Sequence, residues 1–155
     1  MDEAGFIREA TGEDLKEIIN LENRCFHQDH AYSSKQLTYL VTKAHSFTIV
    51  YVNKEKIHGF LILLFRKGSV VSGIETVSVD PSFQKKGIGK KLMLTAEHEA
   101  RKQGIKEIRL EVSIGNTAAI QLYEKLGYVI TALLTEYYQT DHFGSTDAYR
   151  MKKRF

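Results

Sequence analysis

A short basic turn with two glycines is the part of this sequence whose residue types and spacing point most directly to chemistry. Residues 84–91 read QKKGIGKK, and they separate a strand-like run that ends at Val79 from a helix-like run. The start of a helix has N–H groups without partners and a partial positive charge, which attract phosphate. Gly87 and Gly89 let the backbone approach a ligand closely. Four lysines add positive charge at this place: Lys85, Lys86, Lys90 and Lys91. The turn predicts a site for a pyrophosphate or a similar polyanion.

Two common phosphate-binding motifs do not describe this turn. The P-loop pattern G-x-x-x-x-G-K-[ST] is absent from the chain. The dinucleotide fingerprint needs a third glycine where Leu92 stands, and too few residues follow Gly89 for the six-stranded sheet that it normally opens. The alternative to a phosphate site is a solvated lysine face at the start of a helix.

Other reactive residue types form weaker patterns. Cys25 is the single cysteine and no catalytic motif surrounds it, so a buried, inert thiol is the favoured interpretation. His27, Asp29 and His30 cluster in the stretch 27–32. No further ligand stands at a spacing that suits a metal, and a polar loop is therefore expected there, with no metal site.

The elements that must position the turn follow from hydrophobic periodicity. Helix-like spacing of apolar residues and β-branched or alternating runs divide the chain into helices and strands. The expected helices are 13–25, 35–44, 87–103 and 117–126. The expected strands are 6–10, 46–52, 57–66, 69–79, 106–113, 128–138 and 148–155. This order predicts a mixed α/β (α+β) protein with one mixed sheet in a single domain, residues 1–155.

Composition bounds the class of protein. A chain of 155 residues suits one domain with one sizeable core, and a formal net charge of +3 is too small to indicate nucleic-acid binding by itself. One cysteine excludes an internal disulfide and fits a reducing compartment. The start MDEAGF lacks the apolar core of a secretory signal, and the apolar run 60–65 is too short to span a bilayer. A cytoplasmic protein without membrane or nucleic-acid partners is expected.

Two motifs in order resemble those of the GNAT acetyltransferase superfamily. Gln84-Lys85-Lys86-Gly87-Ile88-Gly89 is similar to its coenzyme A motif [QR]-x-x-G-x-[GA], which follows a strand. The stretch 110–129, LEVSIGNTAAIQLYEKLGYV, resembles the second half of the fold, with L-E-V and then N-x-x-A-I-x-L-Y-x-x-x-G-[FY]. The resemblance covers residues 74–138, and the subgroup it resembles most is the RimI-like N-terminal protein acetyltransferases.

The resemblance implies a fold and a co-substrate. It implies a sheet of six to seven strands with about four helices, splayed between the fourth and fifth strands, and acetyl coenzyme A whose pyrophosphate binds the basic turn. Main-chain groups of the fourth strand would pair with the pantetheine arm, and a bulge at Gly73 would bend that strand. The implied coenzyme-binding residues are Val77, Ser78, Val79, Gln84, Lys85, Lys86, Gly87, Ile88, Gly89, Lys90, Asn116 and Tyr123.

The resemblance also implies the catalytic residues. Acetyl transfer to an amine needs a base for the ammonium proton and an acid for the departing thiolate. Alternation along 106–113 places Glu111 opposite the core, and the family implicates the glutamate of L-E-V as base. The matching tyrosine, Tyr123, is the proposed acid. The alternatives are an ordinary exposed glutamate and a core tyrosine, and Asn116 also suits a helix N-cap.

Four further residues are candidates for binding the acceptor. Asp29 lies in the stretch where the family places a substrate-recognition segment. Glu75 shares its facing with Val77 and Val79 by alternation, and it is the reserve base. Tyr137 and Tyr138 match a tyrosine pair that walls the peptide entrance in RimI-like enzymes, where aromatic cover on an edge strand is the alternative. Gln139 follows the pair, although the family usually has proline there.

The implied function is transfer of an acetyl group from acetyl coenzyme A to the N-terminal α-amine of proteins, with ribosomal proteins among the candidate substrates. An α-amine has a reference pKa near 8, against about 10.4 for lysine, so more of it is neutral at pH 7. A lysine or small-amine acetyltransferase is the first alternative. A non-catalytic coenzyme A-binding module is the second, although such a module needs neither Glu111 nor Tyr123. The sequence leaves monomer and homodimer open.

Overall fold

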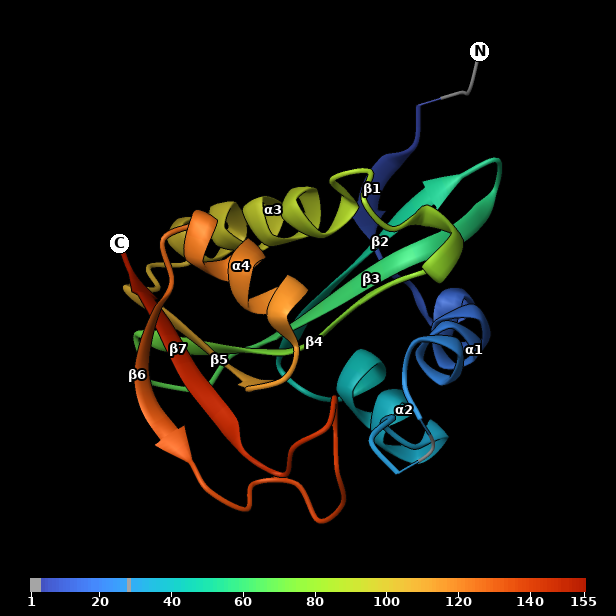
Figure 1. The fold of residues 1–155 in the computed structure, drawn as a ribbon. Helices are drawn as coiled ribbons and strands as arrows, with labels where there is room; N and C mark the ends of the chain where they lie inside the picture. Colours follow the sequence, from blue (N-terminus) through green and yellow to red (C-terminus); the bar gives the residue numbers. More distant parts are fainter. Residues whose placement is uncertain (1–3, 28) are drawn as a thin grey trace.

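One mixed sheet of seven strands organises the computed structural model, which describes residues 4–27 and 29–155 (Figure 1). The strand order across the described sheet is β1-β2-β3-β4-β5-β7-β6. All neighbours in it run antiparallel except β4 and β5, which run parallel. The strands are β1 Phe6–Glu9, β2 Ser46–Asn53, β3 Lys56–Leu64, β4 Val71–Val79, β5 Glu107–Ser113, β6 Val129–Leu134 and β7 Ala148–Arg154.

Four α-helices cover the described part of the sheet from two sides (Figure 1). They are α1 Leu15–Cys25, α2 Ser34–Thr42, α3 Ile88–Lys102 and α4 Thr117–Lys125. Helices α1 and α2 pack on β2, β3 and β4, and α3 packs on the other face of the same strands. Short 3-10 turns precede α1 and α3, at Gly12–Asp14 and Pro81–Phe83.

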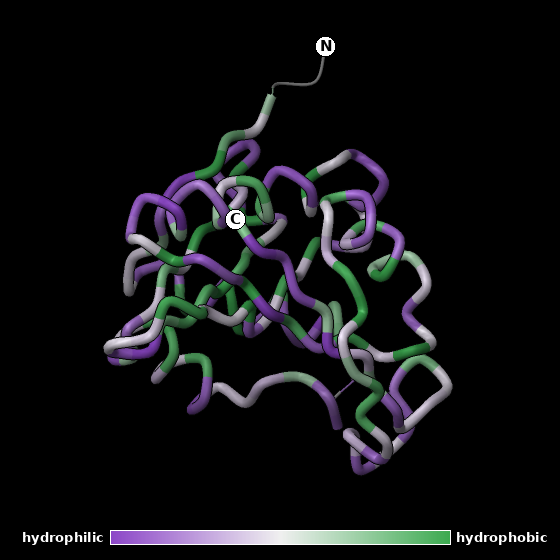
Figure 2. Tube along the Cα trace, turned by 90° about the vertical axis from the view of Figure 1, so that its left-hand side faces the viewer, coloured by the Kyte–Doolittle hydropathy of each residue, from purple (hydrophilic) through white to green (hydrophobic). Residues whose placement is uncertain are grey.

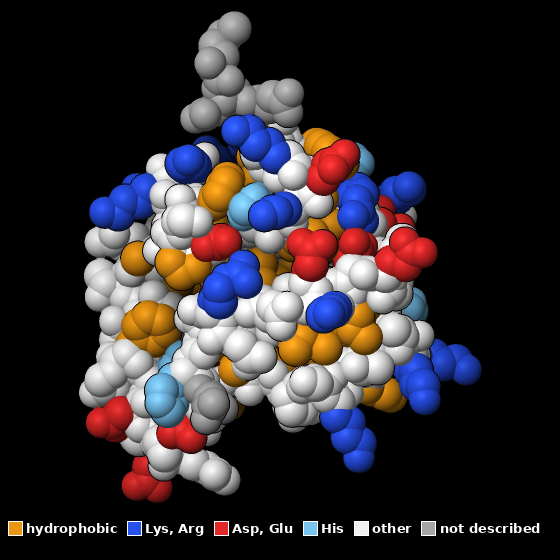
Figure 3. All heavy atoms as spheres, turned by 90° about the vertical axis from the view of Figure 1, so that its right-hand side faces the viewer, with side chains coloured by type: hydrophobic (Ala, Val, Ile, Leu, Met, Phe, Trp, Pro, Cys, Tyr) orange, Lys and Arg blue, Asp and Glu red, His pale blue; other side chains and the backbone are white. Residues whose placement is uncertain are grey.

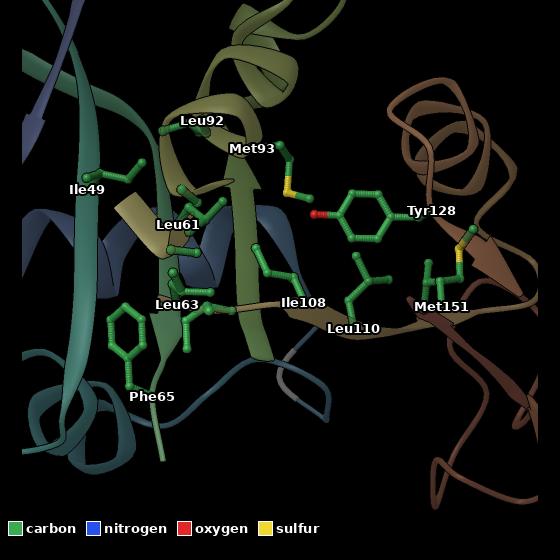
Figure 4. Packing of buried hydrophobic residues seen from close by; sticks show 14 of the residues in the cluster. Ile49, Leu61, Leu63, Phe65, Leu92, Met93, Ile108, Leu110, Tyr128 and Met151 are labelled. Carbon is green, nitrogen blue, oxygen red and sulfur yellow. The ribbon is translucent and has the colours of Figure 1, made fainter. Parts of the chain in front are cut away.

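Strand β3 explains why the core has two parts. Successive side chains of a strand point to opposite faces, so Leu61 and Leu63 pack under α3 while Phe60 and Ile62 pack under α1 and α2. The larger part, under α3, continues through Ile108 and Met151 to the β5 and β7 side of the sheet, as Figure 4 shows. Because β3 is covered on both faces, its sequence reads as a continuous apolar run rather than an alternating one.

The sheet opens between β4 and β5. Val71–Gly73 pairs with Glu107–Arg109, and the two strands share no register partners beyond this point. The expected splay between the fourth and fifth strands is therefore confirmed, as are the seven strands and four helices of the described chain. The expected bulge at Gly73 lies elsewhere, because Ile62 pairs with Thr76 and the next residue of β3 pairs with Ile74. Glu75 is the extra residue.

One strand is shorter than its sequence suggests. The run 128–138 is rich in β-forming residues, but β6 ends at Leu134. Glu136 adopts a left-handed φ of 53° and its N–H donates to a carboxylate oxygen of Asp147 at 2.9 Å, so the chain turns there. The tyrosine pair 137–138 consequently lies in the β6–β7 loop rather than on an edge strand. The other expected elements differ from the observed ones by at most two residues at each end.

Charged side chains pair across the β5 and β7 strands. Figure 2 shows that the chain leading to the C terminus is mostly hydrophilic, and β7 contributes four basic residues to it. The register places Arg150 opposite Glu111 and Arg154 opposite Glu107. On the face shown in Figure 3, Lys and Arg side chains are interspersed with Asp and Glu. None of the helices in the described chain has the length and apolar character needed to cross a membrane.

Candidate active site

A cavity of about 610 Å³ occupies the opening between β4 and β5. Its walls come from β4, β5 and α4, from the loop between α1 and α2, and from the β6–β7 loop. Seven residues singled out in the sequence line it: Glu75, Val77, Glu111, Asn116, Tyr123, Tyr137 and Tyr138. The fold thus brings together side chains that are more than 60 residues apart in the chain, counting from Glu75 to Tyr137.

The basic turn forms the start of α3. Gly87 is the N-cap residue and has a left-handed φ of 78°, which only glycine adopts without strain. The first four N–H groups of the helix, from Gly87 to Lys90, have no partner within it. Residues 84–87 are exposed, whereas Ile88 is buried in the core and offers only its main chain. A Cβ on Gly89 would lie 3.3 Å from Leu122, so this glycine lets α3 and α4 approach each other.

The last three residues of β4 can serve a ligand through their main chain only. The Val77 and Val79 side chains pack against the core under α3, and the Ser78 hydroxyl donates to Glu22 Oε1 at 2.9 Å. The edge of β4 that faces β5 has no strand partner here. An extended pantetheine arm fits this edge, because it carries amide groups that can pair as a strand does.

Glu111 lies on the face of β5 that points away from the α3 core. Its neighbours Leu110 and Val112 are buried in that core, as alternation requires. Within the described chain, Glu111 Oε2 is a buried oxygen without a hydrogen-bond partner, and Arg150 Nε is likewise without one. The two atoms are 3.7 Å apart. The carboxylate oxygen therefore lies beside a positive charge without a hydrogen bond to it, and Glu111 lines the cavity.

Tyr123 and Asn116 come from α4 and the turn before it. Burial raises the pKa of Tyr123 to about 12, which keeps its hydroxyl protonated at neutral pH and able to donate. The Asn116 side chain accepts a hydrogen bond from the Ala119 N–H at 3.3 Å, so it is the N-cap of α4. Both residues line the cavity.

Glu75 does not share the facing of Val77 and Val79 that alternation predicted. Because Glu75 is the extra residue of the bulge, its carboxylate turns to the α1 and α2 side, where the Tyr32 hydroxyl donates to Oε2 at 2.8 Å. Burial of the phenol raises the pKa of Tyr32, and the same carboxylate raises it further.

Sequence reasoning missed two residues of this wall, Tyr32 and Glu22. Glu22 is buried and accepts hydrogen bonds from the Tyr32 N–H at 3.0 Å and from the Ser78 hydroxyl. It thereby ties the end of α1 to β4. A glutamate flanked by apolar residues at helical spacing was the available signal, since Ile18, Leu21 and Cys25 share its helix.

Two loops meet over the cavity through aromatic rings. The Tyr137 and Tyr138 rings lie 5.0 Å apart between centroids, and the His30 ring lies 5.6 Å from that of Tyr138. His30 also lies 4.3 Å from His142, which the sequence gave no reason to select. Asp29, in contrast, is exposed, pairs with His27 at 3.4 Å and does not line the cavity.

The remaining reactive groups do not join the site. Burial and nearby carboxylates raise the pKa of Cys25 to about 11, and its thiol donates to the Val79 carbonyl at 3.3 Å. Its thiol is therefore protonated and unreactive at neutral pH, as the sequence suggested. In the ranges 4–27 and 29–155, no group of three or more His, Cys, Asp or Glu side chains is placed to hold a metal ion.

Fold and site together define a class of protein. A mixed sheet splayed at its parallel pair, with a glycine-capped helix start after β4 and a cavity at the splay lined by Glu111 and Tyr123, is the architecture of acetyl-CoA-dependent N-acetyltransferases. The sequence profile of the Acetyltransferase (GNAT) family matches residues 13–128. The chain belongs to this family, whose members take their acetyl group from acetyl coenzyme A.

Individual relatives are similar to this chain in sequence or in structure. The [Ribosomal protein bS18]-alanine N-acetyltransferase of Escherichia coli (strain K12) is 39% identical over 64 residues, which is 41% of this chain and 43% of that protein. The chain thus aligns with less than half the length of this curated relative. The crystal structure of the Escherichia coli ribosomal-protein-S18-alanine N-acetyltransferase superposes with a TM-score of 0.87 at 26% identity, over 97% of this chain and 93% of that one. Ard1 from Thermoplasma volcanium gives 0.85 at 28% identity, over 98% of both chains.

Proposed function

We propose that this protein transfers the acetyl group of acetyl coenzyme A to the N-terminal α-amine of proteins. One observation carries the proposal: Glu111, whose Oε2 has no hydrogen-bond partner in the described chain, lines a cavity in the splay of the sheet, and the glycine-capped start of α3 follows the end of β4. A single extended ligand can therefore place its phosphates at the helix and its reactive end at a base. The S18-alanine N-acetyltransferase of Escherichia coli, which is similar to this chain in both sequence and structure, supports a protein α-amine as acceptor.

Acetyl coenzyme A fits the groups that the chain offers. The pyrophosphate binds the N–H groups of Gly87 to Lys90, helped by the charges of Lys85 and Lys86. The pantetheine arm pairs with the main chain of residues 77–79 and reaches the side chain of Asn116. The acetyl thioester then lies in the cavity, between β4 and β5.

Two side chains move the protons of the reaction. Glu111 accepts a proton from the acceptor's ammonium group, directly or through a water molecule, and the neutral amine attacks the thioester carbonyl. Tyr123 donates a proton to the departing sulfur, which its raised pKa allows because the phenol is still protonated at neutral pH. Glu75 is already bonded to Tyr32, so we assign it to binding the acceptor rather than to proton transfer.

The acceptor enters between the two loops above the cavity. Tyr137 and Tyr138 form its aromatic wall on the β6–β7 side, and His30 faces them from the α1–α2 side. Asp29 lies outside the cavity wall, where it meets only residues further along the substrate.

We further propose that residues 1–155 form a single GNAT domain, because one continuous sheet runs through the described chain. We also propose that the protein acts in the cytoplasm, and its one unpaired cysteine agrees with a reducing compartment.

Mass spectrometry of acetylated peptides tests this function. Purified protein is incubated with acetyl coenzyme A and short peptides that differ in their first residue, each with a matched copy whose α-amine is chemically blocked and whose lysine is free. We expect a mass gain of one acetyl group on the unblocked peptides alone. Acetylation of the blocked copies at lysine, or of polyamines instead of peptides, would contradict an N-terminal acceptor.

A further inference from the structure

Positive and negative side chains alternate along the floor of the cavity. On β5, Glu107, Arg109 and Glu111 share the face that points away from the α3 core, because every second residue does. Neighbouring β7 places Lys152 opposite Arg109 and Arg150 opposite Glu111. Such a floor suits a ligand that carries both charges.

Arg109 has no ionic partner in the part of the chain that the structure describes. Its neighbour Glu107 is already paired, with Arg154 at 3.1 Å and Lys152 at 3.9 Å, and Glu111 is paired with Arg150. Arg109 is half-buried and lines the cavity, so it brings to the site a positive charge without a counter-ion among the described residues. Arg66, at the cavity rim, also has no ion pair with any described carboxylate.

The space beside Arg109 is left open by a glycine. Gly73 of β4 is the register partner of Arg109 and shares its face of the sheet. A Cβ added at Gly73 would meet only the Arg109 carbonyl oxygen, at 3.8 Å, so nothing else fills this place. Arg109 itself lines the cavity, so a small anionic group that enters the cavity can pair with its side chain.

The Tyr137 hydroxyl is influenced by the same charges. Burial raises the pKa of Tyr137 most, Glu111 and Glu75 raise it further, and Arg150 and Arg109 lower it. Tyr137 lines the cavity together with Glu75, Arg109 and Glu111. On the β5 strand, Arg109 and Glu111 are two residues apart, about 7 Å at the usual rise of a strand.

We propose that Arg109 binds a carboxylate of the acceptor, next to the amine held by Glu75 and Glu111, so that the preferred substrate is a chain beginning with Asp or Glu. This deepens the proposed function and rests on it. Arg109 and Glu111 both line the cavity on one face of β5, so one acceptor can present its side-chain carboxylate to the first and its α-amine to the second. An arginine–carboxylate contact in a partly buried site is among the stronger polar contacts in proteins. A free acidic amino acid presents the same pair of charges and is the other source of such a ligand.

Matched peptides and matched variants test the proposal. Rates of acetylation are compared for peptides that begin with Glu, Gln, Asp, Asn, Ala or Lys and are otherwise identical, and for free glutamate. We expect kcat/KM to be about tenfold higher for the Glu peptide than for the Gln peptide in the unaltered protein. Arg109→Met removes this preference, and Arg109→Lys, which keeps the charge, retains part of it. Arg101→Met, on α3 outside the cavity, leaves the preference unchanged.

The outcomes separate this inference from the proposed function. Equal rates for Glu and Gln peptides, with the Ala peptide acetylated, would overturn the carboxylate site and leave the N-terminal acceptor standing. A preference that survives in Arg109→Met would overturn the role of Arg109. Acetylation of free glutamate but of no peptide would keep the carboxylate site and overturn the protein acceptor, and acetylation of none of them would overturn both. Heat of coenzyme A binding to each variant confirms that the variant is folded.

Discussion

The chemistry of the candidate site depends on side chains whose hydrogen-bonding capacity the fold leaves unused. Glu111 keeps a buried carboxylate oxygen free, and Arg150, the nearest cation, is 3.7 Å from it. A buried polar atom without a partner is unfavourable, and such atoms are retained where a ligand or water completes them. Glu75 differs, because Tyr32 already occupies one of its oxygens. The two glutamates of the cavity therefore differ in their hydrogen bonding, and we assign them different roles.

Tyr123→Phe tests the acid. The phenol pKa of about 12 means that Tyr123 is a donor throughout the neutral range, so removing its hydroxyl removes the proton for the departing sulfur. We expect kcat to fall about 100-fold, since general acid catalysis typically contributes that much or more. Coenzyme A affinity, measured by calorimetry, is expected to change little because the ring remains. Tyr149→Phe, outside the cavity lining, is the matched control. An unchanged kcat in Tyr123→Phe would show that the thiolate leaves without this donor.

At this scale the sequence indicates motif residues and misses those that meet only in space. Glu111 and Tyr123 were predicted because each stands within a recognisable stretch, and both line the cavity. Tyr32 and His142 stand in no motif, and they reach the cavity wall only because the two loops fold together over it. The sequence offered equally little sign that Arg109 has no ionic partner in the described chain. This follows from the pairing of Glu107 with two residues of β7.

Among the elements, α3 is the one to which we assign anion binding. Its N-cap at Gly87 and its C-terminal Gly104 both adopt left-handed backbone angles, with φ of 78° and 83°. Only the first lies at the end where the helix N–H groups are free and the helix dipole is positive. The proposed function therefore predicts that only Gly87 affects coenzyme binding, although the two glycines share a conformation.

Gly87→Ala and Gly104→Ala form a matched pair. An alanine in a left-handed conformation costs about 1–2 kcal/mol, so both variants should lose stability by a similar amount in urea unfolding. Neither added Cβ would contact another residue, so the loss of stability in both variants comes from backbone strain alone. We expect only Gly87→Ala to weaken coenzyme A binding, by about tenfold in calorimetry. Equal weakening in both variants would mean that the start of α3 has no direct part in binding.

The elements were predicted from the sequence where periodicity governs them and not where a turn interrupts it. Strand β5 alternates as expected, and α3 begins and ends at its glycines. Strand β6 ends early because Glu136 turns the chain, although 128–138 is rich in β-forming residues. The bulge in β4 falls on Glu75 and not on Gly73, because register depends on the partner strand rather than on local composition.

On the scale of the whole molecule, two cores on opposite faces hold a sheet that is open in the middle. The α1 and α2 helices cover β2, β3 and β4, while α3 and the larger core extend to β5 and β7. Because β4 and β5 pair only at Val71–Gly73, the two halves diverge beyond it and the cavity fills the gap. The family resemblance carried by the two motifs implied this splay. The loops that close over it could not be predicted, since their meeting depends on the whole fold.

The rate of Glu111→Gln with an N-terminal peptide tests the account most directly. The substitution keeps the shape of the side chain and removes its ability to accept the ammonium proton. We expect kcat to fall about 100-fold or more, while the Kd for coenzyme A changes less than twofold, because the coenzyme binds through α3 and β4. A variant that retains full turnover would contradict the assignment of the base to Glu111.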